Sequence, residues 1–405
     1  MAGLVLLLAM VSGFFLLRDD SVQIIPRPGA GSPSGGETPT REDAAAQLLQ
    51  RLQAGLTSGN RREVVALATP ANKQAAAEIG DIFDNARELG LKDLSFRYVD
   101  ENEGSPGTRE WGADVQMSWR IARFDKAPSM MEVPFVLAQT PSGAAFVSVG
   151  HPPDRAVPLW LLGDLDVQRS RRALVMVAGD APVDDFLSFA DQAVADVRKV
   201  LPRRSGTLVV EVPSTEDDLE RVVGAENGAY QSIAAVTTTV DGSLSPSSPA
   251  HILINPEVFG RLGDDGAQIV VSHEATHVAT SAATSTMPMW LLEGFADYVA
   301  LAHVDLPVSR TASQILAKVR RAGPPKQLPG SVEFDPANAA LGSSYEAAWL
   351  ACRLIGEKYG EQQLIDFYDA VDREVLVGAG FKRYLDTDQR AFTSRWQDYL
   401  RRLAS

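Results

Sequence analysis

The chain has 405 residues, more than one hydrophobic core usually covers, so its length predicts two or three domains. Hydrophobic residues make up 45% of it and charged residues 22%, values near globular averages that exclude wholesale disorder and a multi-pass membrane protein. The formal net charge of -14 argues against a nucleic-acid partner, because binding to phosphates relies on clusters of Lys and Arg. The single cysteine, Cys352, excludes an intramolecular disulfide, and its apolar neighbours predict a buried structural thiol.

The amino-terminal segment is the clearest targeting signal. No residue from 2 to 17 is charged, and Leu, Val and Phe dominate the run. It is shorter than the roughly 20 residues that span a bilayer, and no small-residue cleavage site follows it. We therefore expect residues 1–20 to form an uncleaved membrane anchor with a transmembrane helix, and the rest of the chain to lie outside the cytoplasm. A cleaved signal-like segment and a truncated start are the alternatives.

A linker and a first domain follow. Residues 26–40 are dense in Pro, Gly and Ser, which stay solvated, so a linker is expected over residues 21–40. Apolar residues at helical spacing then predict an amphipathic helix near the start of a domain spanning residues 41–165. Alternation over residues 111–121, with shorter runs beyond, predicts helices packed on a curved antiparallel meander. This order of elements resembles nuclear-transport-factor-2-like domains, which implies a binding pocket or a spacer.

A second domain, over residues 170–405, begins with strands and ends with helices. Four runs have the length and composition of strands: residues 173–177, 208–212, 233–240 and 251–255. Amphipathic stretches predict helices over residues 186–197, 345–359, 362–371 and 392–403. With the first domain, this pattern predicts the fold class α+β.

Residues 273–277 carry the motif on which the functional prediction depends. They read His-Glu-Ala-Thr-His within a run that we expect to be helical. Residues four apart stack on one helix face, so His273 and His277 can direct two imidazole nitrogens at one metal ion. The carboxylate of Glu274 can reach a water molecule at the ion without taking a coordination site, as a general base for hydrolysis requires.

A third ligand is expected, because hydrolytic zinc sites usually combine three protein ligands with an open position for water. Residues 290–298, Trp-Leu-Leu-Glu-Gly-Phe-Ala-Asp-Tyr, predict a second helix whose Glu293 completes a His2Glu set for Zn²⁺. Asp297, one turn later on the same face, can accept the other ring N–H of a ligand histidine and so fix its tautomer. Gly294 is costly inside a helix and makes sense where two helices approach closely.

Together these segments resemble the gluzincin metallopeptidases, especially the peptidase MA-like group, over roughly residues 170–405. The resemblance implies a strand-rich upper lobe with an edge strand beside the cleft, an active-site helix, a second ligand-bearing helix and a helical lower lobe. It also implies the role of each site residue, namely zinc ligands His273, His277 and Glu293, catalytic base Glu274, and Asp297 behind a ligand histidine.

The resemblance adds one further residue and has one departure. In several gluzincins a tyrosine on a later helix stabilises the oxyanion, and Tyr345 is the matching candidate, with a packing role as the alternative. Related aminopeptidases bind the substrate amine with a Gly-x-Met-Glu-Asn motif. This chain has only Gly-Ala-Glu-Asn at residues 224–227, far upstream and without the methionine. Exopeptidase activity is therefore unsupported. An endopeptidase and a very selective processing enzyme are equally consistent with the sequence.

Two functions from different classes stay open. The first is a membrane-tethered zinc peptidase that acts on a peptide or protein substrate. The second is a non-catalytic cell-surface interaction protein whose zinc only staples two helices, which a fourth protein ligand on the metal would favour. His151, His251 and His303 are expected to be structural, although His251, at the start of a predicted edge strand, could also touch substrate. The sequence leaves the substrate and the oligomeric state open.

Overall fold

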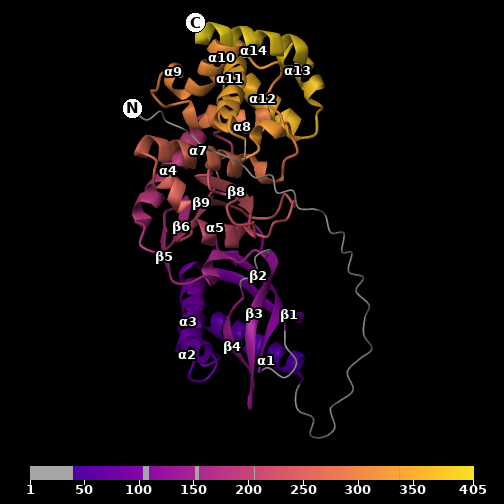
Figure 1. Cartoon of the computed structure of the whole chain (residues 1–405). Coiled ribbons are helices and arrows are strands. Elements are labelled where there is room, and N and C mark those ends of the chain that lie inside the picture. Colours follow the sequence, from indigo (N-terminus) through magenta and orange to yellow (C-terminus); the bar gives the residue numbers. More distant parts are fainter. Residues whose placement is uncertain (1–39, 104–108, 151–154, 205, 337) are drawn as a thin grey trace.

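The computed structural model describes residues 40–103, 109–150, 155–204, 206–336 and 338–405. They form three tiers, with the first domain at the bottom of Figure 1, a second sheet in the middle and helices α8 to α14 at the top. The predicted fold class, α+β, is confirmed.

The expected membrane anchor, residues 1–20, and all but the last residue of the linker lie outside the described residues. Across the ranges that are described, none of the helices combines the length and the apolar character that crossing a bilayer requires. The prediction of a transmembrane helix is therefore wrong for this part of the chain. Even the strongly apolar helix α8, Met289–Leu301, has 13 residues, against the roughly 20 that a span needs.

The first domain packs three helices against a four-stranded antiparallel sheet with strand order β1-β2-β3-β4. Its elements are α1 (Arg41–Ser58), α2 (Arg61–Val65), α3 (Lys73–Glu88), β1 (Leu91–Glu103), β2 (Glu110–Ile121), β3 (Ser129–Thr140) and β4 (Gly143–Val149). Helix α1 is capped at its start by Thr40, whose hydroxyl accepts a hydrogen bond from the Asp43 N–H, and at its end by Gly59 in the left-handed conformation. The predicted helices on an antiparallel meander are present.

Strand β2 shows how the sequence pattern chooses the face that the helices cover. Alternate residues of a strand point to one face of the sheet. The alternating apolar residues of β2 are all buried, namely Trp111, Ala113, Val115, Met117, Trp119 and Ile121. They share one core with Leu48 and Leu49 of α1 and with Ile79 and Phe83 of α3. The period-two pattern therefore places the helices on this face.

The second sheet has the strand order β5-β6-β7-β9-β8. Its strands are β5 (Leu165–Arg169), β6 (Ala173–Ala178), β7 (Leu208–Val212), β8 (Ala235–Thr239) and β9 (Ala250–Ile254). Strands β6, β7 and β9 run parallel, β5 pairs antiparallel with β6, and β8 runs antiparallel to β9 at an edge. The sequence did not predict β5, which lies between the expected domain boundaries, because five residues with two apolar side chains give too weak a pattern.

Both faces of the second sheet are covered. Ala173, Val175 and Val177 of β6 belong to a core that includes buried residues of α4 (Val183–Val200) and α7 (Asp264–Thr280). The intervening residues Leu174 and Met176 point to the opposite face. They belong to the core of the first domain. The first domain therefore lies directly on the sheet.

The remaining helices build the upper tier and the flanks of the sheet. They are η1 (Leu159–Leu161), α5 (Glu216–Val223), α6 (Pro256–Phe259), η2 (Ala282–Thr284), α8, α9 (Val308–Thr311), α10 (Ser313–Ala322), η3 (Ser331–Phe334), α11 (Leu341–Tyr359), α12 (Glu361–Asp372), α13 (Val377–Leu385) and α14 (Gln389–Ala404). A Cβ at Gly294 would overlap the carbonyl oxygen of Ala348, so the glycine admits α11 against α8. Cys352 is fully buried beside it, as predicted.

Candidate metal centre

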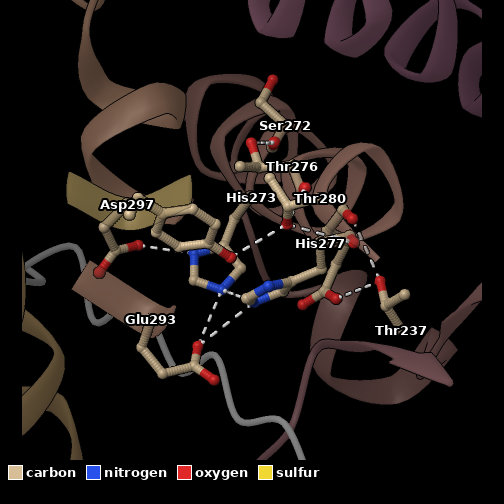
Figure 2. A network of polar contacts seen from close by, with 10 residues as sticks. Thr237, Ser272, His273, Thr276, His277, Thr280, Glu293 and Asp297 are labelled. Carbon is tan, nitrogen blue, oxygen red and sulfur yellow. Dashed lines mark hydrogen bonds and ion pairs between the residues drawn. The ribbon is translucent and has the colours of Figure 1, made fainter. Parts of the chain in front are cut away.

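The two motif segments form neighbouring helices. Helix α7 carries Asp264 and Asp265 in its first turn, where carboxylates favour a helix start. It is buried on nearly every side, which fits a helix that packs against the sheet, α4 and α8 at once. Helix α8 starts after Pro288 and packs beside α7, so that Glu293 faces the histidines of the first motif (Figure 2).

Three side chains converge on one point (Figure 2). Oε2 of Glu293 lies 3.2 Å from Nε2 of His273 and 3.4 Å from Nε2 of His277, and the two Nε2 atoms are 2.9 Å apart. Atoms bound tetrahedrally to one zinc ion at about 2.0–2.1 Å lie about 3.4 Å from each other. The two histidine–glutamate distances are close to that value, and the histidine–histidine distance is shorter. Among the described residues, these three form the group that could hold a metal ion.

The centre is enclosed by protein. His273, His277 and Glu293 are each at most 1% exposed. Oε1 of Glu293 is buried and has no hydrogen-bond partner in the described part of the chain, which is costly for a carboxylate unless a cation lies nearby. Burial alone would raise the pKa of Glu293, but the two imidazoles lower it to about 2 and keep the group ionised. Nδ1 of His277 is also buried and has no hydrogen-bond partner among the described residues.

Asp297 sets the orientation of His273. Its Oδ1 lies 2.8 Å from Nδ1 of the ring (Figure 2). An ionised carboxylate only accepts hydrogen bonds, so the ring donates from Nδ1 and turns Nε2 towards the point of convergence. Burial disfavours a charged ring, but the carboxylates of Asp297 and Glu293 outweigh it and raise the pKa of His273 to about 10. A metal ligand must be the neutral imidazole, so ion binding releases a proton here.

Glu274 is held at one oxygen and free at the other. The hydroxyl of Thr237 donates a hydrogen bond of 2.7 Å to Oε2 of Glu274. Oε1 of the same carboxylate is buried, and none of the described residues forms a hydrogen bond with it. Burial raises the pKa of Glu274, which favours uptake of a proton. The arrangement leaves one oxygen available to a reacting group.

Thr237 is a site residue that the sequence analysis missed. It lies in the edge strand β8, which was predicted as a strand over a slightly longer range, within a run of three threonines. Threonine is common in strands, so its residue type carries no functional signal. Its role depends on the register of β8 with β9 and on the packing of α7 against β8, neither of which the local sequence encodes.

Tyr345 lies beside the centre, in the first turns of α11. It is 3% exposed, and its ring centroid is 6.1 Å from that of His273 and 5.0 Å from that of Phe334. Both ring pairs have edge-to-face geometry, as packed aromatic side chains commonly have. The structure therefore brings the predicted tyrosine next to a candidate ligand, while its role towards an oxyanion stays a prediction.

His251 lies away from the centre. Strand β9 runs between β7 and β8, so it is not the edge strand, and the side chain of His251 faces the first domain. The ring is 2% exposed, with Nδ1 at 2.6 Å from Glu211 Oε1 and Nε2 at 3.0 Å from Asp125 Oδ1. This position fits a structural role and excludes contact with substrate at the metal centre. His151 lies outside the described residues, and His303 is exposed beyond the end of α8.

The tetrapeptide at residues 224–227 has a local explanation. Gly224 adopts the left-handed conformation that ends helix α5, with φ of 66°. Its neighbours continue into the turn after that helix. Gly224 therefore caps helix α5, which explains the glycine without an amine-binding motif.

The centre combines two imidazoles and a carboxylate with a second carboxylate that has one free oxygen. Such a set can bind a divalent cation and can move a proton beside it. No family model, curated protein or solved structure matches this chain. Any function is therefore argued from the geometry of the residues themselves.

Proposed function

We propose that the protein is a zinc-dependent peptidase, in which His273, His277 and Glu293 hold the ion and Glu274 is the general base. The observation that carries this proposal is the convergence of three donor atoms, 2.9 to 3.4 Å apart, from two neighbouring helices. Two imidazoles and one carboxylate are a donor set typical of catalytic zinc.

The number of donors supports a hydrolytic site over a structural one. Structural zinc is usually closed by four protein ligands, whereas catalytic zinc keeps one position open. Within the described ranges the group contains three donors, His273, His277 and Glu293. The second function from the sequence, an interaction protein whose zinc only joins α7 to α8, has no such observation in its favour.

The chain's own residues divide the chemical work. When bound, zinc supplies a Lewis acid that polarises a peptide carbonyl and increases the acidity of water. Oε1 of Glu274 accepts the proton of the attacking water and delivers it to the leaving amine nitrogen. Thr237 fixes Oε2 of Glu274, so the free oxygen keeps its direction. Asp297 keeps the Nδ1–H of His273 engaged and so keeps Nε2 available to the ion.

The decisive test is Glu274→Gln in the full chain, because this change keeps the shape of the side chain and removes the base. We expect wild-type protein to contain zinc and to cleave members of an unbiased peptide library, and a chelator to stop cleavage. Glu274→Gln should retain zinc and lose cleavage by about 10²- to 10⁴-fold. Metal analysis and mass spectrometry of the library measure both outcomes.

Two further variants serve as controls. Glu226→Gln removes an exposed carboxylate after α5 and should leave both zinc and cleavage unchanged. Glu293→Ala should lose both together, because it removes a ligand. Normal activity of Glu274→Gln would refute the mechanism, and zinc without any cleavage in the wild type would support the interaction protein instead.

A further inference from the structure

A cavity of about 430 Å³ lies between the first domain and the second sheet. Trp119 and Met131 line it from the first sheet, and Met176 and Leu253 line it from the second. Trp160, in η1, closes a further side. Small-molecule sites commonly have volumes of roughly 300–1,000 Å³. None of the candidate metal ligands lines this cavity, which lies on the opposite face of the second sheet from α7.

The polar part of the cavity wall is the pair formed by Glu211 and His251. Oε1 of Glu211 is engaged by the imidazole at 2.6 Å. Its other carboxylate oxygen, Oε2, has no hydrogen-bond partner among the described residues, and it is not fully enclosed. Glu211 is only 6% exposed and lines the cavity, so this oxygen faces the cavity. The cavity thus contains a carboxylate oxygen ready to accept a hydrogen bond.

The cavity has an excess of negative charge. Glu211 and Asp241 line it, Asp125 lies directly behind His251, and no Lys or Arg is among its described lining residues. Burial disfavours charge on His251, but the carboxylates of Asp125 and Glu211 outweigh it and raise the pKa of the ring to about 10. The single imidazolium therefore balances one of three carboxylates. An anionic ligand would be repelled here.

The rest of the wall is aromatic and aliphatic. The rings of Trp119 and Trp160 meet edge to face, with centroids 5.9 Å apart. Indole rings offer large apolar surfaces against which the body of a ligand can pack. Met131, Met176 and Leu253 add apolar surface. An apolar body with one positively charged N–H donor would match both parts of the wall.

We propose that this cavity binds a protonated apolar amine, whose ammonium group donates a hydrogen bond to the free oxygen of Glu211. Its apolar body packs against Trp119 and Trp160. A neutral ligand of the same shape loses the charge pairing, and an anionic one meets two carboxylates. The proposal goes beyond the peptidase site and does not depend on it, because the two sites share no residue.

The test compares three probes that share a phenylethyl group on the full chain: 2-phenylethylamine, 2-phenylethanol and 3-phenylpropanoate. Isothermal titration calorimetry and tryptophan fluorescence report binding. We expect the amine to bind at least about tenfold tighter than the alcohol, equivalent to about 1.4 kcal/mol, and the acid not to bind. Glu211→Gln should abolish the preference for the amine, whereas the exposed control Glu226→Gln should keep it.

A second variant separates loss of the site from loss of the fold, because Glu211 also holds His251. Val223→Phe fills the cavity from the end of α5 and leaves the Glu211 contact in place. This variant should keep the wild-type circular dichroism and melting temperature and lose amine binding. Equal affinity of wild type for amine and alcohol, no binding of the amine at millimolar concentration, or wild-type amine affinity in Val223→Phe would each overturn the proposal.

Discussion

Two buried histidines in this protein each lie between two carboxylates, but only one belongs to a group that could hold a metal ion. The carboxylate oxygens lie 2.8 and 3.2 Å from the ring of His273, and 2.6 and 3.0 Å from the ring of His251. The rings are 1% and 2% exposed. The difference is a third donor, because His277 brings its Nε2 to within 2.9 Å of that of His273. No second imidazole of the described residues is bonded to His251.

The two histidines therefore have different roles: His251 links two domains, and His273 belongs to a group that could hold a metal ion. Around His251 both ring nitrogens are used in hydrogen bonds, so the ring ties Asp125 of the first domain to Glu211 of the second sheet. Around His273 one nitrogen is fixed by Asp297, and the other points at a place that two further donors share. A histidine–carboxylate pair becomes a candidate metal centre only where its remaining nitrogen meets other donors.

The largest effect on stability is expected from breaking the link at His251. Asp125→Ala leaves a buried charged ring with one partner fewer and removes the acceptor of the Ile121 N–H. We expect a loss of about 3–5 kcal/mol in the free energy of unfolding, measured with urea on the full chain. Asp398→Ala, which removes an exposed ion pair with Arg401, should cost less than about 1 kcal/mol. Similar losses in both variants would contradict the importance of the link.

Removal of the carboxylate that contacts His273 should weaken metal binding. Asp297→Asn keeps the size of the side chain but weakens the hold on the tautomer of His273 that directs Nε2 at the ion. Loss of such a partner typically lowers metal affinity by about 10- to 100-fold. Competition with a chromogenic chelator measures the change. Unaltered zinc affinity would show that the aspartate does not set the ligand.

A smaller effect on catalysis is expected at the edge strand, provided that the proposed peptidase activity is found. Thr237→Val keeps the shape and removes the donor to Glu274. We expect kcat to fall by about tenfold or more, with KM and zinc content unchanged, because a hydrogen bond to a charged group contributes about 1.5–3 kcal/mol. Thr237→Ser, which retains the hydroxyl, should recover most of the rate. A change in KM alone would exclude a role in positioning the base.

A pH-dependent effect on stability is expected from titration of His251. Folding raises the pKa of this base from 6.5 to about 10, so its stabilising contribution is complete below pH 6.5 and is lost as the pH rises towards 10. Relative to His251→Gln, the free energy of unfolding of the wild type should fall by up to about 1.4 kcal/mol per pH unit across this window. Urea unfolding at several pH values measures it. Equal slopes in the two proteins would contradict a raised pKa.

The sequence predicted the group formed by His273, His277 and Glu293, but it did not predict the contacts of His251 with Asp125 and Glu211. His273 and His277 lie one helical turn apart, so the helix alone brings them together, and Glu293 needed only a neighbouring helix. The link joins His251 to Asp125, 126 residues away in another domain, and no local pattern relates the two. Thr237 was missed for a similar reason, because its contact with Glu274 depends on how α7 packs against β8.

The same contrast holds for the fold. The long alternation over residues 111–121 predicted strand β2 and its buried face, since a period of two over such a length is a strong signal. Strand β5 has five residues, and its place in the second sheet depends on pairing with β6. The coverage of both sheet faces also escaped prediction, because the helix side and the domain side of β6 are equally apolar.

The second sheet contributes side chains to two cores. We therefore expect the second domain to be less soluble when it is expressed without the first. A fragment beginning at residue 170 would lack β5 and leave β6 as an unpaired edge. It would also uncover Leu174, Met176 and Val209, which lie in the core of the first domain. An unpaired strand edge next to an exposed apolar surface promotes aggregation. The first domain thus covers apolar surface of the part of the chain that carries the candidate metal centre.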